Sequence, residues 1–167
     1  MAKDYWLDAN VFIQAKNGPY GFDIAPGFWE IIEDFAQRGI IRSPMNVRAE
    51  LIYHQKDDLS KWANKSSVKA SGLFESSDHA VQIKVGEIAQ FVQERYGAVK
   101  AKPFLNGADP WVIAHACVNK ACVVTWESTV PPNSGQIKIP NIGKQFGVAC
   151  KNTYDLIRAL GVKFGRS

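Results

Sequence analysis

The sequence predicts an α/β fold with a mostly parallel sheet, built as a single domain. Short apolar stretches alternate along the chain with longer segments of helical periodicity, and this order is typical of parallel strands joined by helices. The length of 167 residues suits one domain, so we expect residues 1–167 to form one unit. A composition of 46% hydrophobic and 22% charged residues is ordinary for a globular protein and argues against extended disorder.

The first half of the chain carries clear signals for helix ends. Pro26 suits the first turn of a helix with an apolar face, and Gly39 is placed to end it. Ser43 and Pro44 have the residue types of a helix cap followed by a first turn. The elements expected up to residue 76 are a buried strand at 5–7, a helix at 26–39, a short strand at 40–41, a helix from 43 through His54, and a short helix followed by a loop over 57–76.

The second half is expected to hold three helices and two strands. The clearest helix has apolar residues at three-four spacing and ends at Gly97. Asp109 and Pro110 form a second pair of helix cap and first-turn proline, and a β-branched run before Trp126 indicates a central strand. The elements expected after residue 77 are a helix at 78–96, a loop at 98–107, a helix at 109–117, a strand at 121–125, a proline- and glycine-rich loop at 128–145, a strand at 146–150 and a helix at 153–160.

Acidic residues follow two of the expected strands. Asp8 comes directly after the first strand, and Glu127 follows the strand that ends at Thr125. In parallel α/β sheets, ligands bind outside the carboxyl ends of the strands. Asp109 opens a helix that immediately precedes the second of these strands. We therefore expect the three carboxylates to face one rim of the sheet.

Glu50 is a fourth candidate because of its place on a helix. The helix expected from Ser43 has one face made of Val47, Glu50, Leu51 and His54. This face is mostly apolar and should point at the core. Burying an unpaired charge costs several kcal/mol, so Glu50 needs a cation or a metal as its partner.

A cluster of these carboxylates predicts a site for Mg²⁺ or Mn²⁺. Carboxylates that are brought together repel one another and raise one another's pKa values, and a divalent cation turns that repulsion into ligation. Ligand sets made only of oxygen favour Mg²⁺ or Mn²⁺ over zinc or copper. Such ions activate water and stabilise the charge that develops on a phosphodiester. The residues thus indicate metal-dependent phosphodiester hydrolysis.

Four segments, taken in order, resemble the motifs of the PIN-domain nucleases. They are YWLDANVFI, SPMNVRAEL, LNGADPWVIAHA and VVTWE. The resemblance implies a three-layer sandwich in which a mostly parallel five-stranded sheet is flanked by helices. It also implies a divalent-metal endonuclease, usually acting on RNA. Many small members are VapC-like toxins of toxin–antitoxin pairs, so an antitoxin protein is an implied partner, and members often form homodimers.

The resemblance also assigns roles to individual residues. It makes Asp8, Glu50 and Asp109 the main acids of the catalytic metal site, and Glu127 the fourth acid. Glu127 stands where the family more often has aspartate. The supporting residues it implies around Asp8 and the metal are Asn10 and Thr125.

Basic residues suit a polyanionic substrate held by its backbone. The chain has 20 basic and 16 acidic residues, a formal charge of +4. If the four acids turn inward onto a metal, the remaining surface is more basic still, which suits RNA or DNA. The lysines expected in loops, where they could contact phosphates, are Lys100, Lys102, Lys138 and Lys144.

Each acid also has a structural alternative. Asp8 could end its strand in an Asx-turn, and Asp109 could serve only as a helix cap. Glu50 could pair with Arg48, Arg42 or a lysine, and Glu127 could be a solvated loop acid. Under that reading the protein would be a non-catalytic module that binds RNA or another protein. Another phosphoryl-transfer α/β enzyme is a further alternative, but a haloacid-dehalogenase-like phosphatase needs an aspartate where Asn10 stands.

Compartment signals favour the cytoplasm. The first residues place charge within the first apolar stretch, unlike a signal peptide. We find no apolar run near the roughly 18 residues of a membrane span. The chain has three cysteines, an odd number, without CxxC spacing. We therefore expect reduced core cysteines, as in a reducing compartment.

Overall fold

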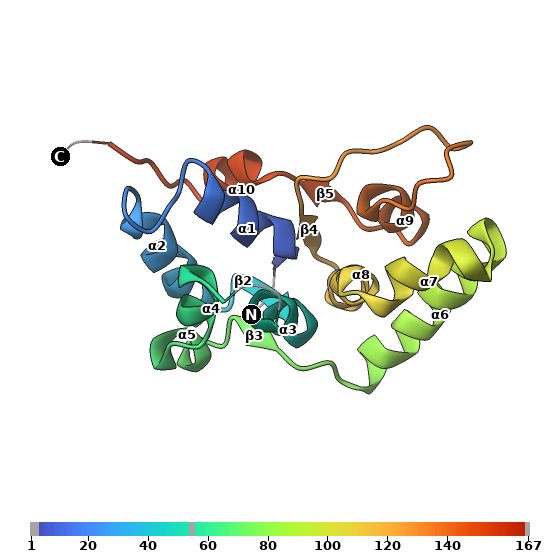
Figure 1. Cartoon of the computed structure of the whole chain (residues 1–167), viewed down its shortest axis with the longest axis horizontal. Coiled ribbons are helices and arrows are strands. Elements are labelled where there is room, and N and C mark those ends of the chain that lie inside the picture. The colour runs from blue at the N-terminus through green and yellow to red at the C-terminus, as the bar shows by residue number, and fades with distance from the viewer. Residues whose placement is uncertain (1–3, 54–55, 166–167) are drawn as a thin grey trace.

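The computed structural model describes residues 4–53 and 56–165 (Figure 1). Its five strands form one sheet in the order β3-β2-β1-β4-β5, and every strand pair is parallel. The α/β prediction is therefore confirmed. The strands are β1 (Tyr5–Leu7), β2 (Ile41–Pro44), β3 (Phe74–Glu75), β4 (Cys122–Val124) and β5 (Cys150–Lys151).

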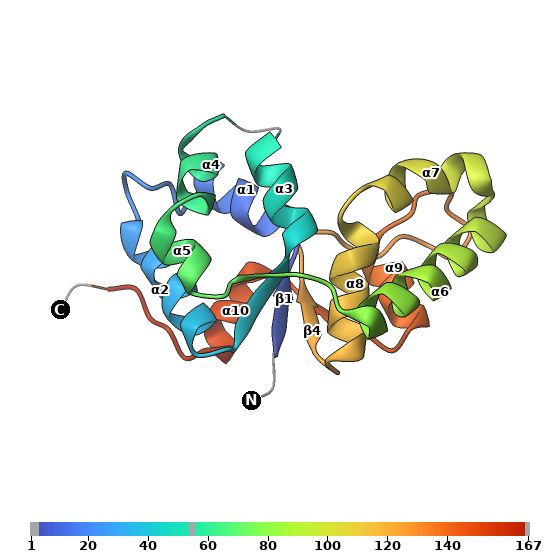
Figure 2. The same ribbon diagram turned by 90° about the horizontal axis from the view of Figure 1, so that it is seen from below.

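Helices cover both faces of this sheet and make a three-layer sandwich. Figure 2 shows α6, α7, α8 and α9 on one side of the strands and α1, α2, α5 and α10 on the other. The helices are α1 (Ala9–Asn17), α2 (Pro26–Gln37), α3 (Met45–Tyr53), α4 (Asp58–Ala63), α5 (Ser66–Ala70), α6 (His79–Tyr96), α7 (Ala98–Asn106), α8 (Asp109–Val118), α9 (Ile139–Gln145) and α10 (Thr153–Ala159). No helix among the described residues combines the length and apolarity that a membrane crossing requires.

The direction of strand addition reverses between β1 and β4. Successive strands are added on one side of β1 as far as β3, and the chain then crosses over to place β4 on the other side. Leu7 of β1 pairs with Val124 of β4, so the two strands end level with each other. Such a reversal leaves a crevice at the carboxyl ends of the two strands, the usual ligand site of open α/β sheets.

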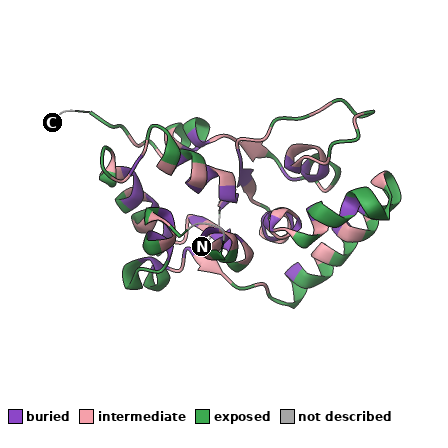
Figure 3. Cartoon of the chain, viewed as in Figure 1, coloured by how far each residue is buried: buried purple, intermediate pink, exposed green. Residues whose placement is uncertain are grey.

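The core lies where the central strands meet the inner helices. Trp6 and Leu7 of β1 and Val123 of β4 are fully buried. Figure 3 shows burial concentrated in these strands and in the sides of helices that face them. An aromatic cluster fills the space around α1, α2 and α4; its members are Phe12, Phe22, Trp29, Trp62 and Phe74. The strands that carry the candidate acids are therefore held rigidly from both sides.

Several helix predictions were wrong. The stretch 98–107, expected to be a loop, contains α7, and the stretch 128–145, expected to be mainly loop, is a loop up to Lys138 and ends in α9. Ala101 and Phe104 of α7 are buried, so tertiary packing stabilises a helix even though Pro103 lies inside it. The chain also forms α1 and α5, for which no helix was predicted.

The strand limits also differ from expectation. β2 continues to Pro44, so the next helix begins at Met45 and Ser43 does not cap it; the Ser43 hydroxyl instead donates to the Leu7 carbonyl at 2.7 Å. The region 57–76 contains the unexpected strand β3, and the last strand is limited to Cys150–Lys151 where 146–150 was expected. His54, the expected end of the third helix, lies outside the described residues.

Candidate functional site

Asp8 lies at the centre of the candidate site, between β1 and α1. It is the N-cap of α1, and its side chain is only 4% exposed. One carboxylate oxygen, Oδ1, accepts a hydrogen bond from the Ala9 amide at 2.7 Å. The other, Oδ2, accepts one from the Thr125 hydroxyl at 2.9 Å. The carboxylate is thus joined to β1 through the chain and to the end of β4 through Thr125.

Asn10 and Thr125 connect the two strand ends. The Asn10 amide group donates to the Thr125 hydroxyl oxygen at 3.2 Å, and its carbonyl oxygen accepts from the Trp126 amide at 3.1 Å. The Thr125 hydroxyl oxygen also accepts from the Glu127 amide at 3.1 Å. Thr125 therefore contacts Asp8 directly, across 117 residues of sequence, and Asn10 contacts it through the Thr125 hydroxyl.

Glu127 connects the site to the segment that follows β4. Its Oε2 accepts a hydrogen bond from the Ile139 amide at 2.7 Å, at the first residue of α9. An amide at a helix start is a favourable partner for a carboxylate. This contact is inconsistent with the alternative of a freely solvated loop acid. It joins the two ends of the intervening segment 128–138.

Glu50 lies on α3, which follows the carboxyl end of β2. Its Oε1 accepts a hydrogen bond from the Ala108 amide at 2.9 Å. In the described part of the chain, the structure shows no ion pair between Glu50 and either Arg42 or Arg48. Arg42 Nε lies 3.8 Å from Glu75 Oε1, and Arg48 Nη2 donates to Asn64 Oδ1 at 2.8 Å. Glu50 therefore holds the start of α8 close to the end of α3.

Asp109 is the first residue of α8 and does not cap it. The cap position belongs to Ala108, so the prediction that Asp109 serves as the helix cap was wrong. The reason is that the chain already turns into helical geometry at Ala108, whose amide bonds to Glu50. Asp109 is half-buried and lines a hollow of about 410 Å³ together with Lys100 and Gly135.

The carboxylates act on one another electrostatically. The pKa of Asp8 is raised from 3.8 to about 6, mainly by burial and further by repulsion from Glu127 and Glu50. The hydrogen bond from Thr125 lowers this pKa in part. Burial, followed by repulsion from the other three acids, raises the pKa of Asp109 from 3.8 to about 8. The positive charge of Lys138 lowers the pKa of Asp109 in part. Glu50 and Glu127 are thus both within electrostatic reach of Asp8 and of Asp109.

The acids do not form a closed cage. Among the described residues, no three His, Cys, Asp or Glu side chains already stand as a set able to hold a metal ion. Glu50, Asp109 and Glu127 line three different surface hollows around the buried Asp8. Glu50 and Glu127 each use one carboxylate oxygen to accept a hydrogen bond from a backbone amide, that of Ala108 and that of Ile139 respectively.

The candidate substrate lysines divide into two groups. Lys100 lines the hollow beside Asp109, and Lys138 acts on the Asp109 charge, so both lie near the acids. Lys102 is exposed on α7, and Lys144 lines a separate pocket beside Arg95. Only Lys138 stands outside a helix; the expectation of loop positions was wrong for Lys100, Lys102 and Lys144, because 98–106 and 139–145 fold as α7 and α9.

The sequence did not reveal the contacts that orient the acids. The amides of Ala108 and Ile139 are backbone groups, and no residue type marks them. Their only sequence signal is a proline in the first turn of each following helix, Pro110 and Pro140. The three cysteines were expected to be reduced core residues; they are free, but all three are half-buried and not in the core.

Comparison with known proteins identifies one family. A family model described as a domain of unknown function (DUF4411) matches residues 5–164, nearly the whole chain. Neither the curated proteins nor the solved structures contain a match.

Proposed function

We propose, from the premise that this chain belongs to the DUF4411 family, that it is a divalent-metal-dependent nuclease whose substrate is RNA. One observation carries the proposal. Carboxylates from four separate segments, Asp8, Glu50, Asp109 and Glu127, interact at the strand ends where the sheet order reverses. A protein that only binds a partner has no need for mutually repelling, partly buried acids.

The acids suit Mg²⁺ or Mn²⁺ by their chemistry. All four offer carboxylate oxygen, the ligand type these ions prefer. Burial, and after it repulsion between the acids, raises the pKa values of Asp8 and Asp109, and a bound cation would offset that repulsion. We assign Asp8, Glu50, Asp109 and Glu127 as the residues that would hold the ion. When bound, such an ion supplies an activated water and stabilises charge on the phosphodiester.

The chain's own residues prepare this site. The Thr125 hydroxyl holds the Asp8 carboxylate in place and favours its ionised form. Asn10 keeps Thr125 and Trp126 fixed relative to α1. Asp109 keeps its proton up to a pH of about 8 and gives it up when a cation takes the place of that proton. Ligand binding and proton release are therefore coupled at this residue.

The proposed substrate is RNA, and the proposed location is the cytoplasm. Lys100 and Lys138 lie beside Asp109 and could hold the phosphates next to the scissile bond. Cysteines that form no disulfide suit a reducing compartment. The resemblance to PIN-domain nucleases supports RNA over DNA. It also makes a toxin role, an antitoxin partner and a homodimer parts of the same proposal.

The test is metal-dependent cleavage by the Asp8→Asn variant. Purified protein is incubated with a labelled single-stranded RNA and Mn²⁺, and the rate of cleavage is measured. Wild type should cleave, and chelation by EDTA should abolish cleavage. Asp8→Asn should lose roughly 1,000-fold in rate, because metal stabilisation of the transition state supplies several kcal/mol.

Glu94→Gln is the matched control, since Glu94 is an exposed acid on the far helix α6. It should cleave like wild type. Wild-type cleavage that survives EDTA, or an Asp8→Asn variant as active as wild type, would show that the assignment is wrong.

A further inference from the structure

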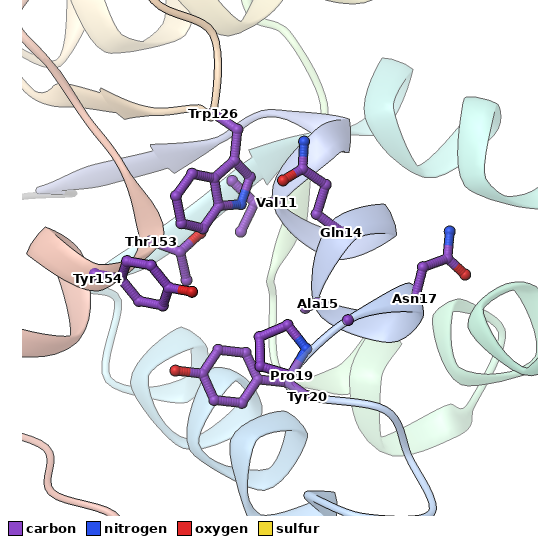
Figure 4. A pocket seen from close by; sticks show the side chains of 10 residues that line it. Val11, Gln14, Ala15, Asn17, Pro19, Tyr20, Trp126, Thr153 and Tyr154 are labelled. Atoms are coloured by element: carbon purple, nitrogen blue, oxygen red, sulfur yellow. The ribbon is translucent and has the colours of Figure 1, made fainter.

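A pocket of about 360 Å³ lies between α1 and α10, next to the candidate site (Figure 4). Its size falls in the range of about 300–1,000 Å³ that small-ligand sites occupy. Trp126, Tyr154 and Tyr20 contribute its aromatic side chains, and Gln14 of α1 places an amide beside Trp126. None of the ten lining residues is charged.

Trp126 joins this pocket to the carboxylates. It lies between Thr125, which holds Asp8, and Glu127, and its amide donates to Asn10 at 3.1 Å. Its position is therefore fixed by the same hydrogen bonds that fix the acids. A chain of nucleotides with one phosphate at the acids would have its neighbouring nucleoside beside Trp126.

The lining has the chemistry that recognises a base. Trp126 and Tyr154 meet edge to face, with ring centres 5.0 Å apart and planes at 77°. This leaves ring surface available, and Tyr154 is 44% exposed. Aromatic faces stack on unpaired bases, and amides can both donate to and accept from base edges. A neutral lining is unsuited to a phosphate, which the lysines beside Asp109 would contact instead.

We propose that the pocket lined by Trp126 and Tyr154 binds an unpaired nucleobase adjacent to the cleaved phosphodiester. This inference rests on the proposed nuclease function and specifies its substrate as single-stranded. A base in a duplex is already paired and stacked, so it cannot enter the pocket without being flipped out of the helix. Single-stranded RNA and DNA share the base chemistry, and both should use the pocket.

The test measures binding and cleavage separately. Binding of labelled ten-nucleotide single strands is followed by fluorescence anisotropy in the Asp8→Asn background, where the proposed function predicts no cleavage. Adding Trp126→Leu or Tyr154→Leu should weaken binding roughly 5- to 100-fold, the effect of losing one stacked base. Trp126→Phe should keep most of the binding affinity for single strands, because an aromatic ring remains.

Tyr96→Leu is the matched control, since Tyr96 is a half-exposed aromatic in a different pocket. Added to Asp8→Asn, it should leave the affinity for single strands unchanged. RNA and DNA single strands should respond alike to Trp126→Leu, and a hairpin duplex of the same sequence should bind more weakly and be indifferent to the substitution.

Failure of this inference differs from failure of the proposed function. Cleavage is compared in the wild-type background. If wild type cleaves with Mn²⁺, Trp126→Leu cleaves single strands as fast as wild type, and adding Trp126→Leu to Asp8→Asn leaves binding unchanged, the pocket assignment is overturned and the nuclease stands. If no cleavage occurs but binding of single strands depends on Trp126, the pocket stands and the nuclease falls. Equal dependence on Trp126 for duplex and single strand, or no binding of either by the parent, overturns the inference.

Discussion

At the scale of single residues, the pKa of Asp109 is raised further than that of Asp8. The pKa of Asp109 is raised from 3.8 to about 8, first by burial and then by the other acids. An acid whose pKa is higher in the folded than in the unfolded protein stabilises the fold only while it is protonated. Its contribution is complete below pH 3.8 and is lost as the pH rises to about 8. The site therefore weakens the fold at neutral and alkaline pH.

Asp109→Asn should stabilise the metal-free protein. At pH 8.5 in EDTA we expect its free energy of unfolding to exceed that of wild type by about 2–5 kcal/mol, because the variant carries no charge there. The difference should shrink toward zero near pH 4. Thermal unfolding across a pH series measures both. A variant no more stable than wild type at pH 8.5 would contradict the repulsion between these acids.

Thr125→Val should shift the pH dependence of cleavage. The Thr125 hydroxyl donates to Asp8 and lowers its pKa, which burial holds at about 6. Without this bond the pKa of Asp8 rises further, so the acidic limb of the rate profile should move to higher pH. Thr125→Ser should keep the wild-type profile because it retains the hydroxyl. An unchanged profile in Thr125→Val would exclude this positioning role.

At the scale of elements, the segment between β4 and α9 controls Glu127. Glu127 bonds to the Ile139 amide at one end of this segment. The Asn141 side chain accepts from the Val130 amide at 2.9 Å and donates to the Val130 carbonyl at 2.8 Å. Together these contacts tie the segment 128–138 to α9. The fourth acid is thus placed by a loop and a short helix, while Asp8 is placed by the sheet.

Asn141→Ala should loosen this segment without unfolding the domain. Loss of the two hydrogen bonds between Asn141 and Val130 should lower the free energy of opening this loop by about 1–3 kcal/mol. We expect faster hydrogen exchange and faster proteolysis within 128–138, with the melting of the rest little changed. Asn133→Ala, at an exposed position of the same segment, is the control. Equal protection in both variants would mean that Asn141 does not hold the segment.

At the scale of the whole molecule, stability and metal binding should be coupled. The acids come from segments as far apart in sequence as Asp8 and Glu127, so an ion that binds them joins both halves of the sheet. Such an ion binds the folded chain and not the unfolded one, which raises the free energy of unfolding. Protons compete with the ion for Asp8 and Asp109, so the effect should grow with pH.

Mn²⁺ should raise the melting temperature more at pH 8 than at pH 5. An ion at 100 times its dissociation constant adds about 2.7 kcal/mol, which corresponds to roughly 5–10 °C for a chain of this size. Sodium chloride at matched ionic strength is the control for simple screening. The same shift with sodium chloride, or an undiminished Mn²⁺ shift in an Asp8→Asn, Asp109→Asn double variant, would argue against a shared ion.

The sequence by itself determined the fold class and the candidate acids. Strands at β1 and β4 were predicted from apolar and β-branched runs, and the carboxylates that follow them were singled out because parallel strands end at one rim. Glu50 was found because a charge on an apolar helix face requires a partner, and its partner is the Ala108 amide. These features are local patterns, so a single sequence reveals them.

Only the tertiary structure decided how the acids are held. β3 and β5 have two residues each, too few to show a period, and they become strands because a neighbour in the sheet supplies their hydrogen bonds. α7 forms around Pro103 because Phe104 is buried. The Asn10–Thr125 bond and the Glu127–Ile139 bond depend on how distant segments pack, which no local pattern encodes. Long-range packing therefore turns a set of predicted acids into a site.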